Sequence, residues 1–101
     1  MSRLLYAPAA KADLDDIWSY TVERWGEAQA ADYLRAIDAA CRGLVDGAKL
    51  SKAIDDIRPG YRKAFAQRHV IYFRLDGAGD AVIVRILHQV RDVERHLPME
   101  E

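Results

Sequence analysis

The stretch IRPGYRKAFAQRHVIYFRLDGAGDAVIVRILHQVRDVERHL, residues 57 to 97, decides the fold of this chain. Alternation of apolar and polar side chains predicts three strands, at residues 61 to 67, 69 to 75 and 81 to 88. A Pro-Gly turn precedes the first strand, and the glycine-rich residues 76 to 79 predict a hairpin loop between the last two. Residues 89 to 97 are charged and predict a short C-terminal helix or an irregular tail.

The third strand contains one polar side chain in an apolar run. Strict alternation would place Val82, Val84 and Ile86 on one face and Arg85 on the other, beside Ile83 and Leu87. An arginine in that position has to reach solvent or an acid, because a buried unpaired guanidinium is very costly. We expect either a solvated outer face or an ion pair with one of the acids of the first helix, which are Asp13, Asp15 and Asp16.

Two helices precede this sheet. Residues 3 to 7 form a short β-like run, and Pro8 then favours a helix start. Apolar side chains at helical spacing predict one helix up to Trp25, where Gly26 fits a left-handed cap, and a second over residues 27 to 46. The connection is so short that the helices should form an antiparallel hairpin. Residues 47 to 56 show no clear period and predict a loop.

The predicted order is therefore β-α-α-β-β-β with a helical tail. We expect an α+β fold in which the helical hairpin packs on a small antiparallel sheet. At 101 residues the chain is long enough for one core only, so we expect a single domain over residues 1 to 101.

Composition excludes several classes of site and location. No apolar run approaches the ~20 residues that span a bilayer, and the N-terminal apolar stretch is too short for a signal peptide, so we expect a cytoplasmic protein. Cys41 is the one cysteine and cannot form an internal disulfide. With a single cysteine and three scattered histidines, we expect no metal site and no cofactor.

Charge is segregated along the chain. The net charge is -1, yet residues 57 to 97 carry eight basic and four acidic side chains, a local charge of +4. Such a small excess, interrupted by acids, is weak for nucleic acid, because that affinity depends on many phosphate contacts. It fits a surface that docks an acidic protein partner.

Several motifs together resemble the ParE branch of the RelE/ParE superfamily of bacterial type II toxins. They are ADLDDIWSYTVERWG and QAADYLRAI in the helical hairpin, IRPGYRKA entering the sheet, HVIYFR in the middle strand, and VIVRILHQVRDVERHL at the end. Together they cover nearly the whole chain. Their combination is specific, although no single motif decides the matter.

The resemblance implies a small toxin held inactive by an antitoxin that is encoded beside it. ParE-like members are known as poisons of DNA gyrase, with a ParD-like protein as the neutralising partner, commonly in a hetero-oligomer. RelE-like relatives instead cut mRNA on the ribosome. We expect the gyrase-binding activity, with no direct specific nucleic-acid binding. The alternatives are a ribosome-dependent endoribonuclease of the RelE type and an inactive homologue that still binds antitoxin.

The basic residues of the sheet region are the candidates for partner binding. An arginine fork binds carboxylates in a bidentate way, which suits an acidic antitoxin arm. This candidate set consists of Arg58, Arg62, Arg68, Arg74, Arg85, His88 and Arg91. If the chain were a nuclease, its general acid, base and phosphorane-stabilising cation would come from Arg62, Arg85, His88 and Arg91.

Other conspicuous residues have structural explanations. We expect Trp18 and Trp25 to pack in the core between hairpin and sheet, since buried aromatics dominate small cores. Tyr20 is either a boundary residue or part of a partner groove. The acids at 13, 15 and 16 are expected to complement the helix dipole rather than to bind metal.

Overall fold

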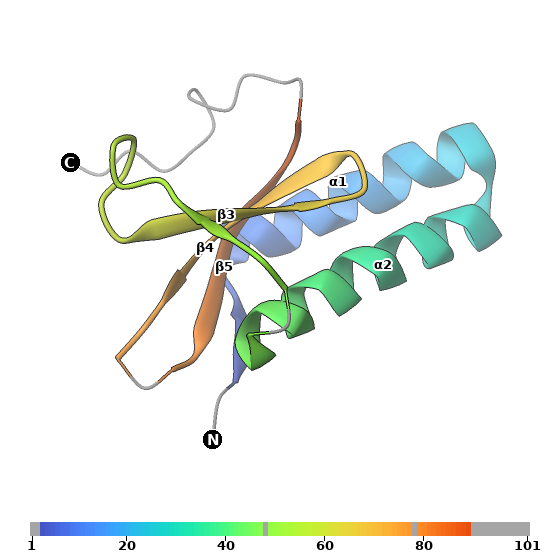
Figure 1. Ribbon diagram of the computed structural model, residues 1–101. Coiled ribbons are helices and arrows are strands. Elements are labelled where there is room, and N and C mark those ends of the chain that lie inside the picture. Colours follow the sequence, from blue (N-terminus) through green and yellow to red (C-terminus); the bar gives the residue numbers. More distant parts are fainter. Residues whose placement is uncertain (1–2, 48, 78, 90–101) are drawn as a thin grey trace.

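The computed structural model describes residues 3–47, 49–77 and 79–89. Two helices, α1 (Pro8–Trp25) and α2 (Glu27–Asp46), lie antiparallel on one face of a sheet (Figure 1). The strands are β1 (Leu4–Tyr6), β2 (Lys52–Ala53), β3 (Tyr61–Ala66), β4 (His69–Leu75) and β5 (Ala81–His88). The expected α+β fold is confirmed. The expected C-terminal helix and Arg91 lie outside the described residues.

Local sequence signals set both helix boundaries. Pro8 opens α1 after the extended Ala7, and Gly26, at a φ of 89°, ends it while accepting the first bond of α2. The Gly26 amide donates to the Val22 carbonyl at 2.9 Å. Gly47 ends α2 in the left-handed region at a φ of 78°, which glycine adopts without steric cost. The two helices are therefore held as a tight hairpin, whose turn projects beyond the strands in Figure 1.

The sheet differs from the expected one in two respects. Its strand order is β1-β5-β4-β3-β2, and β1 pairs with β5 in parallel, so the sheet is mixed. The helical hairpin carries the chain from β1 at one edge of the sheet to β2 at the other, and the antiparallel strands β2 to β5 then lead back to β1. In the stretch expected to be a loop, Lys52 and Ala53 pair with Lys63 and Arg62 of β3. Strand β2 has only two residues, too few for an alternating pattern to be visible in the sequence.

A β-bulge in β5 overturns the expected alternation. Tyr72 pairs with Arg85, whereas the next residue, Phe73, pairs with Ile83, so Val84 is the extra residue. Ile83 and Ile86 consequently lie in the same core, although strict alternation separates them. The bulge brings the backbone after Arg85 to face α1.

Apolar side chains form two clusters, one on each face of the sheet. The larger lies under the helices and includes Ile17, Ile37, Phe73 and Ile83. The smaller lies on the opposite face, where Ile54, Val70, Tyr72 and Leu87 pack together with Tyr61 at their edge. Among the described residues, no helix is long and apolar enough to cross a membrane.

Candidate partner-binding site

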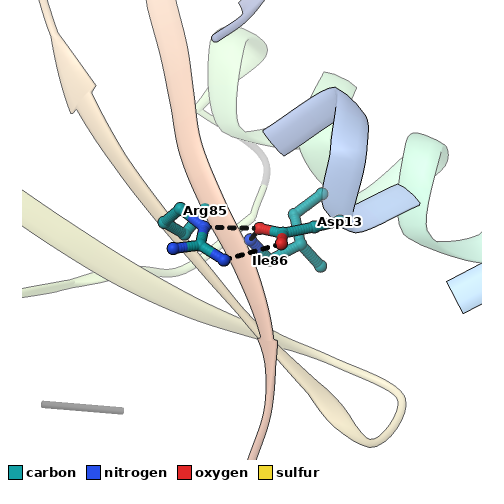
Figure 2. A network of polar contacts seen from close by, with 3 residues as sticks. All are labelled: Asp13, Arg85 and Ile86. Carbon is teal, nitrogen blue, oxygen red and sulfur yellow. Dashed lines mark hydrogen bonds and ion pairs between the residues drawn. The ribbon is translucent and has the colours of Figure 1, made fainter. Parts of the chain in front are cut away.

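A partly buried ion pair joins α1 to the centre of β5. The Arg85 guanidinium donates through Nε to Asp13 Oδ2 and through Nη2 to Asp13 Oδ1, both at 2.8 Å (Figure 2). The Ile86 amide donates to Asp13 Oδ2 at 2.9 Å. The bulge presents this amide to the helix, so one carboxylate satisfies both the arginine and the backbone. The bidentate bond to Asp13 raises the pKa of Arg85 above its ordinary value.

This pair decides between the two roles expected for the acids of α1, which are an ion pair with Arg85 and a favourable interaction with the helix dipole. Asp13 is buried, while Asp15 and Asp16 are exposed. The first turn of α1 contains no acid, so the helix dipole does not account for Asp13. Its burial is instead explained by the three donors that surround it, and the expected ion pair with Arg85 is confirmed.

A second polar network lies at the end of the sheet beneath the helices. The Arg68 amide donates to the Tyr33 hydroxyl oxygen at 3.0 Å, and this oxygen lies 2.7 Å from His69 Nδ1. The His69 and His88 rings, on paired strands, meet edge to face at 5.4 Å between centroids. Burial raises the pKa of Tyr33, so its hydroxyl stays protonated and suited to donate to His69. The network ties α2 to β4, β5 and the turn between β3 and β4.

Two hollows open around this network, and a third, shallow one lies on α1 alone. The first, with a volume of about 190 Å³, lies between α1 and β5 and is lined by Asp13, Asp16, Arg85 and both histidines. The second, of about 380 Å³, lies between the closed end of the hairpin and the β3–β4 turn. A third runs along the outside of α1 beside Trp18. Tyr20 lines all three.

The expectation that both tryptophans lie in the core is wrong. Trp18 is 39% exposed and Trp25 is 58% exposed, and Tyr20 between them is 43% exposed. The buried side chains of α1 are instead Ala10, Asp13, Ile17 and Thr21. The sheet beneath α1 is already filled by its own aliphatic side chains and Phe73, so small and medium side chains face it.

The structure divides the candidate basic residues between the two ends of the sheet. Arg58 lies over the Tyr61 ring at 5.5 Å, and Tyr61 pairs with Arg74. Arg62 donates through Nε to Ser51 Oγ at 2.8 Å and through Nη2 to the Ser51 carbonyl at 3.2 Å. The three basic residues Arg58, Arg62 and Arg74 therefore lie at one end of the β3–β4 hairpin. They are not adjacent to the histidines.

Arg68 and His88 lie at the other end, where both line the second hollow. Arg85 lies between the two groups, held by Asp13. For the nuclease set, Arg62 is four residues along the strands from the row of Ala66, His69 and His88, which is roughly 13 Å. Of the described members of that set, Arg85 and His88 line the first hollow together, whereas Arg62 lies apart from them. Among the described residues, no group of three or more histidine, cysteine or carboxylate side chains could hold a metal ion.

The sequence does not indicate that Tyr33 would bond to His69 and the Arg68 amide. Tyr33 lies on the apolar stripe of α2, where an aromatic residue predicts core packing. Its hydroxyl position depends on the β3–β4 turn, which is 35 residues away in sequence. Spacing along the chain contains no information about such a contact.

Comparison with known proteins places this architecture in a family. Residues 4–93 match the family model described as ParE toxin of type II toxin-antitoxin system, parDE. Toxin ParE1 of Mycobacterium tuberculosis is 45% identical over 96 residues, which are 95% of this chain and 98% of that protein. Toxin ParE1 of Caulobacter vibrioides is 39% identical over 87% of this chain and 90% of the relative.

A solved structure agrees with the sequence comparison. A chain of the chromosomal ParDE TA system from P. aeruginosa superposes with a TM-score of 0.73 at 25% identity. The match covers 87% of this chain and 96% of that chain. Since the family match spans both helices and all five strands, the resemblance seen in the motifs is confirmed. This chain belongs to the ParE toxin family of type II toxin–antitoxin systems.

Proposed function

We propose that this chain inhibits growth by binding DNA gyrase and that a ParD-like antitoxin neutralises it in a hetero-oligomeric complex. The observation that carries the proposal is the family match over residues 4–93. The matched region extends from β1 past β5, so we treat residues 1 to 101 as one toxin domain. A gyrase target and an encoded antitoxin both place its action in the cytoplasm.

The arrangement of charge supports action by binding. Arg85 is bound to Asp13 through Nε and Nη2, and Arg62 is bonded to Ser51. General acid–base chemistry on RNA needs a base, an acid and a cation within hydrogen-bond reach of one phosphate. Arg68 and Arg74, which are exposed and lie apart from this ion pair, fit protein docking better, because each can meet a separate carboxylate of a partner.

The test uses the purified full-length chain with gyrase and a relaxed plasmid. We expect loss of supercoiling, and we expect the antitoxin encoded beside the chain to restore it when premixed. In a cell-free translation system the mRNA should stay intact at the same toxin concentration. Because both assays use one preparation, toxin quality is controlled within the experiment.

Two results would contradict the proposal. One is full supercoiling at a toxin concentration that arrests growth. The other is ribosome-dependent mRNA cleavage that disappears in His88→Ala, which would identify a nuclease of the RelE type. Arg74→Ala is the matched control, since Arg74 is an exposed basic residue at the other end of β4.

A further inference from the structure

The face of the sheet that points away from the helices carries a lysine and an exposed aromatic ring on β3 (Figure 1). Lys63 pairs with Tyr72, and Phe65 pairs with Val70. Direct cross-strand partners point to the same face of a sheet. Since Tyr72 and Val70 belong to the apolar cluster opposite the helices, the side chains of Lys63 and Phe65 lie on that face as well.

Two lysines face each other across the last two strands of this sheet. Lys52 of β2 is the direct antiparallel partner of Lys63, and Lys52 is exposed. Like charges in directly opposite positions destabilise a pair of strands. A lysine on an edge strand protects a sheet from pairing with other chains, which explains Lys52 alone. It does not explain the second lysine on the inner strand β3, so the pair indicates a negatively charged ligand.

Aromatic rings alternate with cations along β3. Phe65 is 54% exposed, and the Lys63 ammonium lies 5.6 Å from the centroid of its ring. Two residues before Lys63, the Tyr61 ring lies under the Arg58 guanidinium at 5.5 Å. Alternate residues of a strand share a face, so the three β3 side chains lie in one row. We define the β3 strip as Lys52, Tyr61, Lys63 and Phe65.

Acidic side chains are kept off the β3 strip. None of the described strand residues is an acid. Asp76 and Asp80, which interrupt the basic segment in the sequence, lie in the loop between β4 and β5, where the Asp80 amide donates to Asp76 Oδ1. The turn before β3 carries Asp55 and Asp56, and Asp55 accepts a bond from the Gly60 amide at 2.8 Å. Charge that is diluted along the sequence therefore has one sign along the strip.

We propose that the β3 strip binds single-stranded nucleic acid without sequence preference. The ammonium groups of Lys52 and Lys63 meet phosphates, and a base stacks on the exposed ring of Phe65. Aromatic rings beside a row of cations hold unpaired strands in this way, because every base has a face that can stack. Lysine is depleted at protein–protein interfaces but commonly binds phosphate, which favours a nucleic acid over an acidic protein. The inference goes beyond the proposed function and does not depend on it.

The test is fluorescence anisotropy of a short labelled oligothymidylate with the purified full-length chain, in the absence of gyrase and antitoxin. We expect a dissociation constant of about 10⁻⁶ to 10⁻⁴ M at near-physiological salt, which is typical of non-specific binding. Affinity should fall as salt rises, because binding releases counterions from the phosphates. An oligonucleotide that does not bind in this range would overturn the proposal.

Removal of the two lysines tests the phosphate contacts. Lys52→Gln/Lys63→Gln should weaken binding roughly 10-fold and reduce the slope of log affinity against log salt by about 1.4, since each single-strand phosphate contact contributes about 0.7. Lys11→Gln/Arg35→Gln is the matched control, because it changes the net charge equally at exposed positions of α1 and α2. Equal losses in both double variants would show that net charge, not the strip, causes binding.

Removal of the exposed ring tests the stacking contact. Phe65→Ala should weaken binding by at least about 5-fold and leave the salt slope unchanged, because stacking is not an ionic contact. Trp25→Ala is the matched control, since Trp25 is 58% exposed on α1, and its affinity should stay within about 2-fold. Circular dichroism and thermal melting of each variant separate loss of affinity from loss of folding. Folded Phe65→Ala that binds like the unchanged chain would overturn the assignment to nucleic acid.

An oligoglutamate peptide of the same charge tests the alternative of an acidic protein partner. It should bind at least about 10-fold more weakly than the oligothymidylate, because it has no base to stack on Phe65. Equal or tighter binding of the peptide that is lost in Lys52→Gln/Lys63→Gln would assign the strip to acidic proteins instead. Since gyrase and antitoxin are absent from all these measurements, failure here leaves the proposed function intact, and failure of the supercoiling assay leaves this inference intact.

Discussion

The two faces of α1 are the reverse of what their residue types predict, because polar side chains face the sheet and large aromatic side chains are exposed. Toward the sheet, the helix buries a carboxylate, a hydroxyl and one isoleucine, at Asp13, Thr21 and Ile17. Toward solvent, it exposes Trp18, Tyr20 and Trp25. The polar groups inside are fully bonded, with Asp13 held by Arg85 and Thr21 donating to the Ile17 carbonyl at 2.7 Å. Large apolar surface outside has no such explanation within the described fold.

This contrast separates stability from recognition on a single helix. A helix whose best core-forming side chains face outward gives up hydrophobic stabilisation of its own fold. The arrangement is reasonable if a partner covers the outward face. The inward face then has to position the helix, which the Asp13 carboxylate does by bonding to both a side chain and the backbone of β5.

The largest expected effect comes from breaking the inward ion pair. Asp13→Ala should lower the free energy of unfolding by about 3–5 kcal/mol, because the half-buried Arg85 loses its counter-charge and Ile86 its acceptor. Urea denaturation measures this loss. Asp15→Ala, two residues away and exposed, should stay within about 0.5 kcal/mol. Equal losses in the two variants would remove the distinction between the faces.

Truncating one apolar side chain on each face gives the next largest effect. Ile17→Ala should destabilise by about 2–4 kcal/mol, because Ile17 is 7% exposed and its removal leaves a cavity. Trp25→Ala should cost only about 1–2 kcal/mol despite removing a larger side chain, since more than half of Trp25 already contacts water. Thermal or urea unfolding compares the pair directly. The reverse order would show that the tryptophan belongs to the core.

Alkaline pH tests how much a buried ionisable side chain of α2, Cys41, contributes to stability. Burial raises the pKa of the Cys41 thiol to about 11, and burial likewise raises the pKa of Tyr6, whose hydroxyl donates to Asp38. The fold thus favours the protonated thiol, so its stabilising contribution is full below about pH 9 and is lost as pH rises through 11. Stability should fall by up to about 3 kcal/mol over this range.

Urea unfolding at pH 8 and pH 11 measures that loss. The Cys41→Ala variant should show a shallower decline over the same interval, even though its stability at pH 8 is lower. An identical decline in both proteins would mean that the thiol contributes nothing to the alkaline instability.

The smallest effect concerns the hydrogen bonds that the Tyr33 hydroxyl makes with the β3–β4 turn. Tyr33→Phe keeps the ring but leaves the Arg68 amide and His69 Nδ1 without the hydroxyl, which should cost about 1–2 kcal/mol. Tyr61→Phe is the matched control, because it removes a tyrosine hydroxyl from β3 on the other side of the sheet. Hydrogen exchange at the Arg68 amide should accelerate in Tyr33→Phe alone. Unchanged protection there would contradict the role of the hydroxyl.

Much of the fold could be predicted from the sequence because its signals are local. Pro8 and the glycines at 26 and 47 mark helix ends through their own backbone preferences, and alternation marks β3 and β4. The bulge at Val84 and the parallel pairing of β1 could not be predicted in this way. Both depend on contacts between distant segments, and a bulge changes the alternation from which a strand is recognised.

The candidate site was less predictable for a related reason. Basic residues were noticed because charge is visible in a sequence, but their grouping depends on register, which separates Arg62 from His88. The sequence does not decide between a boundary and a partner-groove role for Tyr20, because the hollows that this residue lines form only in the folded chain. Helical spacing predicts both tryptophans in the core because it identifies an apolar stripe without showing which stripe faces the sheet.

The central claim is that α1 is stabilised through one face and recognises a partner through the other. It is tested most directly by measuring antitoxin affinity and the free energy of unfolding for Ile17→Ala and Tyr20→Ala in one buffer. We predict that Tyr20→Ala loses affinity by about 30-fold with little loss of stability, whereas Ile17→Ala loses about 2–4 kcal/mol of stability with nearly unchanged affinity while folded. Parallel losses of both quantities in both variants would contradict it.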